Sequence, residues 1–149
     1  MDWIRYTEMY DRINGKKGLI DTNNEYSISE ILLKVKDHAN NYPYNLFIKW
    51  GALLEYRAGN RKEASNLLKL LEEPSREKSI FFSMIPVIAR MMQNAINEKY
   101  IYDNKSVKTI TALSDNYPGF KRFAEAKGLL NRKDMNVEEI ARLLPYYYS

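Results

Sequence analysis

Residues 50–64 read Trp-Gly-Ala-Leu-Leu-Glu-Tyr-Arg-Ala-Gly-Asn-Arg-Lys-Glu-Ala, and this stretch describes two helices joined by a turn. Gly59 and Asn60 suit the turn, because glycine tolerates a positive φ and asparagine is a good first cap. Apolar and small residues on either side recur with the i, i+3, i+4, i+7 spacing of one helix face. They are Phe47, Trp50, Gly51 and Leu54 before the turn, and Ala64, Leu67, Leu68 and Leu71 after it. The stretch therefore predicts an antiparallel helix hairpin.

Helical spacing extends over almost the whole chain of 149 residues, and no long segment alternates apolar with polar residues as a half-buried strand would. Glycine and proline, which turns of β-sandwiches and barrels use heavily, number only six and five. We therefore predict an all-α fold in one domain, 1–149. The expected helices are 2–13, 27–40, 44–58, 61–72, 76–99, 105–115, 119–130 and 137–145.

Several helix starts carry recognisable signals. Pro43 and Pro118 suit a first helical position, where a missing N–H costs nothing. In a capping box, the first side chain accepts from a free helix N–H and an acid three residues later reaches back. That spacing occurs in Ser27/Glu30, Asn60/Glu63 and Asn136/Glu139.

The chain also resembles itself. Asn41-Tyr42-Pro43 recurs as Asn116-Tyr117-Pro118, and in both copies an aromatic pair, a small residue, an Asn-x-x-Glu cap and a leucine pair follow. Half of the offset between the copies is close to the length of a helix-hairpin repeat. Four hairpins fit the chain.

Residues 42–73, above all the quoted stretch, resemble a tetratricopeptide repeat, and 117–146 resembles a second copy. Leu54 stands where that family usually has tyrosine, and the second copy lacks the Gly-Asn turn. The resemblance implies a solenoid of antiparallel hairpins with a concave groove for another protein. The Tyr-Pro and the residues 55–59 are also similar to small chaperones of type III secretion needle subunits, which implies a secretion-system client as one kind of partner.

By position in the family, the resemblance places one set of groove-facing residues on the first helix of the repeat and another on the second copy. Ile48 and Ala52 stand where the family's carboxylate clamp has lysine and asparagine, so an apolar or aromatic helix fits the groove better than a C-terminal tail. Packing between repeats is the alternative interpretation of the same residues. The candidate partner-binding residues are Asn45, Ile48, Ala52, Glu55, Tyr56, Lys121 and Glu125.

The net charge of +4 lies entirely in the second half, and 105–133 holds seven basic residues against Asp115 and Glu125. This region is either a solvated basic face or a surface for nucleic acid or an acidic partner. The aromatic residues Tyr117, Phe120 and Phe123 have core spacing, which argues against stacking on bases.

Residues 80–92 are apolar on all sides of a helix. They form either a core helix or an exposed, methionine-rich face for docking or homodimerisation. Pro86 predicts a kink or a division of this helix. The tyrosines at 146–148 either cap the last hairpin or contact a partner.

Catalytic and metal-binding chemistry finds little support. His38 is the only histidine and the chain has no cysteine, so neither a triad with a histidine base nor a thiolate zinc site can be assembled. Glu72 and Glu73 are adjacent and point to different sides of a helix. We expect no enzyme activity, no cofactor and no metal.

The first residues lack a secretory h-region, and the longest apolar run is too short to span a bilayer. We therefore expect a cytoplasmic protein that acts as an adaptor or chaperone by binding a helical or extended segment of another protein. Nucleic-acid binding through 105–133 and a self-associating structural subunit remain alternatives.

Overall fold

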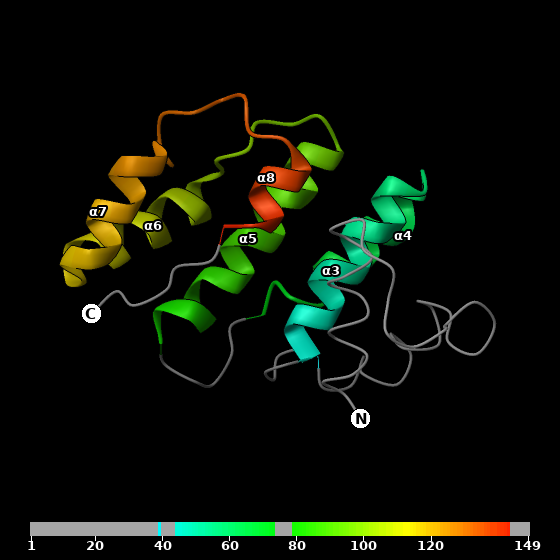
Figure 1. Cartoon of the computed structure of the whole chain (residues 1–149), viewed down its shortest axis with the longest axis horizontal. Coiled ribbons are helices and arrows are strands. Elements are labelled where there is room, and N and C mark those ends of the chain that lie inside the picture. Colours follow the sequence, from blue (N-terminus) through cyan, green and yellow to red (C-terminus); the bar gives the residue numbers. More distant parts are fainter. Residues whose placement is uncertain (1–38, 40–43, 74–78, 144–149) are drawn as a thin grey trace, which may run out of the picture. The chain divides into compact units, whose positions relative to one another are not determined.

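The computed structural model describes residues 39, 44–73 and 79–143 (Figure 1). The described residues form helices and no strand, so the all-α class is confirmed for this part of the chain. The helices are α3 (Tyr44–Arg57), α4 (Arg61–Lys69), α5 (Ile80–Ile96), α6 (Asn104–Asn116), α7 (Pro118–Lys127) and α8 (Val137–Ala141).

Each of these helices corresponds to one that the sequence predicts, with ends that differ by a few residues. Outside the described residues lie the predicted helix 2–13, the predicted helix 27–40 apart from Ala39, the Ser27/Glu30 cap, Pro43 and the tyrosines at 146–148. Contacts divide the chain into two compact units, Met1–Leu71 and Glu72–Ser149, which we describe separately. The arrangement as a solenoid of eight helices stays a prediction.

In the first unit, α3 and α4 pack on each other as the predicted hairpin. Gly59, with φ of 88°, forms the turn: its N–H donates to Tyr56 O at 3.0 Å, and the next N–H, of Asn60, donates to Glu55 O at 2.9 Å. These two bonds are the Schellman pattern that ends many helices.

The predicted capping box of α4 is wrong, because the Asn60 side chain makes no cap hydrogen bond. Its Nδ2 donates instead to Glu55 Oε2 at 2.8 Å, across the turn. This bond orients the Asn60 amide toward the preceding helix, and its oxygen, the atom that would cap α4, accepts no N–H of that helix. Asn136 does cap α8, accepting from Glu139 N at 2.8 Å, whereas the Glu139 carboxylate accepts from Arg132 at 2.7 Å.

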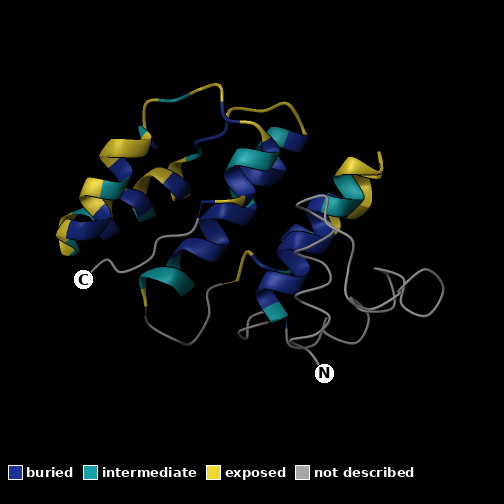
Figure 2. Cartoon of the chain, viewed as in Figure 1, coloured by how far each residue is buried: buried dark blue, intermediate teal, exposed yellow. Residues whose placement is uncertain are grey.

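In the second unit, α5 is the central helix, and both α6 and α8 pack on it (Figure 1). Figure 2 shows that α5 is buried along most of its length. Met84–Ala89, Met91 and Met92 are buried, which confirms the core interpretation of the apolar run. Phe81 and Phe82 near the start of α5 are half-buried and pack edge to face, with ring centroids 5.3 Å apart.

Pro86 lies inside α5 without dividing it, contrary to one of the two predicted effects. A proline removes one backbone hydrogen bond from a helix. Because Pro86 is flanked by residues that are buried against neighbouring elements, packing holds the helix together on both sides of the missing bond.

Two further helix ends repeat the pattern of Gly59. Gly128, with φ of 61°, ends α7 with bonds from Gly128 N to Glu125 O and from Leu129 N to Ala124 O. Glu98, with φ of 56°, follows α5 with bonds from Glu98 N to Ala95 O and from Lys99 N to Asn94 O. A glutamate therefore holds a left-handed position that favours glycine.

Replacing Glu98 by glycine should stabilise the second unit relative to Glu98→Ala by about 1 kcal/mol, because only glycine adopts the left-handed conformation without steric cost. Both variants remove the same side chain, so their difference isolates the backbone effect. Urea unfolding followed by circular dichroism measures it. Equal stability of the two variants would contradict the strain at this position.

Candidate interaction surface

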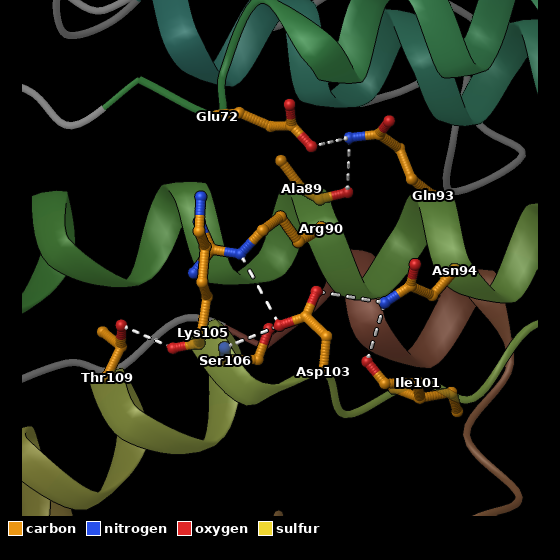
Figure 3. A network of polar contacts seen from close by, with 10 residues as sticks. All are labelled: Glu72, Ala89, Arg90, Gln93, Asn94, Ile101, Asp103, Lys105, Ser106 and Thr109. Atoms are coloured by element: carbon orange, nitrogen blue, oxygen red, sulfur yellow. Dashed lines mark hydrogen bonds and ion pairs between the residues drawn. The ribbon is translucent and has the colours of Figure 1, made fainter.

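A polar network around Asp103 joins α5 to the start of α6 (Figure 3). Asp103 is the N-cap of α6, and its Oδ1 accepts from Ser106 N at 2.7 Å. From α5, Asn94 Nδ2 donates to Asp103 Oδ2 at 3.4 Å and to Ile101 O at 3.2 Å. Arg90 Nε lies 3.9 Å from Asp103 Oδ1. One carboxylate thus fixes both the helix start and the preceding loop.

Gln93, also on α5, points away from Asp103 and toward Glu72 (Figure 3). Its Nε2 donates to Glu72 Oε1 at 2.9 Å. Gln93 is buried, so this bond satisfies an amide that water does not reach.

The environment of Asp103 favours its charged form. Burial alone would raise the pKa of this carboxyl, but hydrogen bonds from Ser106 and Asn94 and the positive charge of Arg90 outweigh it and hold the pKa below its usual range. The charged carboxylate is therefore the form that stabilises the network.

The loop 97–103 also contacts the loop 128–136, which joins α7 to α8. The Tyr102 hydroxyl donates to Met135 Sδ at 3.3 Å, and both residues are buried. Burial raises the pKa of Tyr102 and Arg132 only partly offsets it, so the hydroxyl stays a donor. α6 and α7 are joined by Tyr117 alone and pack on each other, so they form a hairpin. The start of α6 and the end of α7 therefore lie side by side at the open end of this hairpin, and the loops 97–103 and 128–136 are attached there.

Tyr100, in the loop 97–103, is an exposed aromatic residue, with 58% of its surface accessible. Its ring meets the Tyr102 ring edge to face, with centroids 6.2 Å apart. Lys133 Nζ, from the other loop, lies 6.0 Å from the Tyr100 centroid, at the limit of a cation–π contact. The two loops therefore present Tyr100 in a defined orientation.

The arginines near this end are engaged with acids. Arg132 bonds Asp134 at 3.1 Å and Glu139 at 2.7 Å, and Arg90 lies beside Asp103. By contrast, five exposed lysines at the loops, at the first turns of α6 and at the end of α7 form no ion pair with an acid in the part of the chain that the structure describes. We call them the lysine cluster: Lys99, Lys105, Lys108, Lys127 and Lys133.

The large hydrophobic side chains that are exposed in the described residues are Tyr100, Val107 (37%) and Leu130 (42%). Tyr100 and Leu130 lie on the two loops and Val107 in the first turn of α6, so they all belong to the end of the unit that carries the lysine cluster. Each has a member of the cluster within three positions in the chain. Figure 2 shows exposed stretches in both loops. Together these residues make the candidate interaction surface.

Most of the groove residues that the sequence predicts on α3 are inaccessible in this structure. Asn45, Ile48 and Ala52 are at most 1% exposed, and a partner does not reach them in this arrangement. Glu55 and Tyr56 are half-buried, and Glu55 accepts from Asn60. For these last two residues, partner binding stays a prediction.

The other predicted partner-binding residues, Lys121 and Glu125, are exposed on α7 in the second unit, whereas the α3 set belongs to the first unit. Of the aromatic residues in the basic region, Phe120 is buried, as its spacing predicts, and packs on half-buried Phe123 with centroids 5.9 Å apart. Tyr117 is half-buried.

Sequence reasoning did not find Tyr100, Val107 or Leu130 as surface residues. Periodicity marks apolar residues as candidate core, and only tertiary packing shows which of them stay exposed. The sequence did contain a signal for the N-cap of α6, because Asp103 is a residue type that favours the N-cap and stands just before the helical spacing of that segment begins.

Within the described residues, no group of three His, Cys, Asp or Glu side chains could hold a metal ion. None of the described helices has both the length and the apolar character needed to cross a membrane. No protein-family model, curated protein or solved structure shows significant similarity to the chain. The resemblance to tetratricopeptide repeats therefore stays a prediction from the sequence.

Acidification should weaken the Asp103 network. A carboxyl whose folded-state pKa is lowered stabilises the fold above its unfolded pKa, about 4, and loses that contribution as pH falls through the folded value. Asp103→Asn keeps a capping oxygen but does not titrate. The stability advantage of the wild type over this variant should therefore be constant near neutral pH and shrink below about pH 4. Urea unfolding at a series of pH values measures it, and an advantage that grew on acidification would contradict the assignment.

Proposed function

We propose that the chain is a non-enzymatic protein–protein interaction module, an adaptor or chaperone built from helix hairpins, and that the candidate interaction surface contacts its partner. One observation carries the proposal: exposed Tyr100, Val107 and Leu130 gather at one end of the second unit, among five lysines that form no ion pair within the described residues. Apolar side chains in a charged surround are a common composition of protein-binding surfaces.

Tyr100 is the best anchor on this surface. Tyrosine buries a large area at low entropic cost and is enriched among residues that dominate binding energy. Its ring is already oriented by Tyr102, which is itself bonded to Met135. A partner would therefore spend little energy on ordering the side chain.

The hairpins α3–α4 and α6–α7 support the helical-repeat part of the proposal. The internal duplication aligns α7, which Pro118 starts at the N1 position, with α3, and α8 with α4. In the first copy α3 and α4 pack on each other, whereas in the second copy α7 packs on α6. A secretion-system client is one kind of partner that the sequence resemblance implies. Self-association through α5 loses support, since the residues predicted for that face are mostly buried.

Affinity capture from the native cell tests the proposal with two variants of the full chain. Tyr100→Ala/Leu130→Ser removes exposed apolar groups, whereas Thr111→Ala/Ala112→Ser alters the outer part of α6 away from the loops. We expect at least one protein to be captured by the wild type and by the α6 control and to be reduced about tenfold with the loop variant, a loss of about 1.4 kcal/mol. Quantitative mass spectrometry measures it.

All three chains must have the same helix content by circular dichroism. If every captured protein is retained equally by the wild type and the loop variant, the surface does not carry the interaction and the proposal fails.

A further inference from the structure

We infer that the candidate interaction surface recognises an acidic segment of a partner protein in which carboxylates alternate with apolar side chains. This inference rests on the proposed function and specifies the chemistry of the partner. It depends on two features of the same surface, namely lysines that have no counter-ion in the part of the chain that the structure describes, and apolar side chains interspersed among them.

The charge argument starts from a difference between three arginines of the second unit and the lysine cluster. A fourth arginine, Arg122 on α7, is exposed and forms no ion pair within the described residues. Arg90, Arg132 and Arg142 each lie within ion-pair distance of an acid that the chain itself supplies. The five lysines of the lysine cluster form no such pair with any acid of residues 44–73 or 79–143. Their positive charge is therefore not neutralised within the described structure and is available to carboxylates from outside.

The location of the positive charge also supports binding of an acidic segment. The region 105–133 carries seven basic residues against Asp115 and Glu125. Asp115 is one residue from the far end of α6, whereas Glu125 lies in the last turn of α7, two residues before Lys127. The loops add Glu98, Asp103 and Asp134, of which Asp103 pairs with Arg90 and Asp134 with Arg132, so the five lysines still outnumber the acids that these arginines leave at this end. A negatively charged ligand thus meets an excess of positive charge at the loop end, where attraction speeds association and fixes orientation.

The apolar argument separates a peptide from a nucleic acid. Single-stranded nucleic acids bind basic grooves that also offer several aromatic faces to successive bases. Here Tyr100 is the exposed aromatic side chain in the described residues, Phe120 is buried, and Phe123 is half-buried against it. Val107 and Leu130 offer no stacking face but do cover aliphatic or aromatic side chains of a peptide.

The arrangement predicts a division of roles. Tyr100 and Leu130, on the two loops that Tyr102 and Met135 hold together, contact the apolar side chains of the segment. Lys99 and Lys133 on the same loops pair with its carboxylates. Lys105 and Lys108 on the first turns of α6 extend the pairing beyond the loops.

Fluorescence anisotropy with the full chain tests the inference at about 0.15 M salt, where exposed charges act over about 8 Å. Four labelled probes are compared: a peptide of alternating Glu and Leu or Phe, the same peptide with Gln for Glu, the same peptide with Ser for its apolar residues, and a single-stranded RNA of equal charge. We expect the first peptide to bind at least about tenfold more tightly than the other three.

Two charge-reversed variants locate the site. Lys105→Glu/Lys133→Glu should weaken binding of the acidic apolar peptide by about tenfold or more. Lys62→Glu/Lys69→Glu makes the same change in net charge at two exposed lysines of α4, in the first unit. This control should weaken binding much less. Equal loss in both variants would overturn the site, since it would show a response to net charge alone.

Other outcomes overturn the inference in distinguishable ways. Tighter binding of RNA than of the peptide would identify a nucleic-acid surface. Equal binding of the Gln and Glu peptides would remove the charge argument. If no peptide binds but a captured protein still depends on Tyr100 and Leu130, the acidic chemistry is wrong while the proposed function stands; if capture is also independent of them, both fail.

Discussion

The carboxylate of Asp103 is the constraint on which the arrangement of the second unit depends. It satisfies a free N–H at the start of α6 and meets Arg90 and Asn94 on α5, so two helices and the loop between them share one anchor. A cap is worth about 0.5–2 kcal/mol, and its loss would also remove the counter-charge of Arg90 and one of the two acceptors of Asn94. The orientation of Tyr100 and the placement of the first lysines of α6 follow from this anchor.

α5 supplies the apolar counterpart. Its buried methionines and aliphatic residues must be covered on more than one side, and α6 and α8 provide that cover. Once α6 is fixed on α5 by Asp103 and α7 follows α6 after Tyr117, the loop after α7 has to return across the start of α6 to reach α8. The contact between Tyr102 and Met135 closes that path, and it brings together exposed residues from positions about thirty apart in the chain.

The sequence predicted the local structure of the described residues well and their surfaces poorly. Apolar spacing located the helices, and Gly59 and Pro118 marked a turn and a helix start where the structure has them. Asn60 misled because its amide nitrogen donates to Glu55 on the preceding helix, and a capping pattern does not take into account a bond that orients the side chain in this way. Ile48 and Ala52 misled differently: periodicity shows that they share a face with their neighbours, but not whether that face is covered.

The central claim is that Asp103 holds the two loops in the arrangement that presents Tyr100 and the lysines. Amide hydrogen exchange of the wild type and Asp103→Ala at neutral pH tests it most directly. The claim predicts exchange about tenfold faster, or about 1.4 kcal/mol less protection, in residues 99–107 of the variant, with α3 and α4 unchanged. Unchanged exchange in residues 99–107, or an equal acceleration over the whole chain, would contradict it.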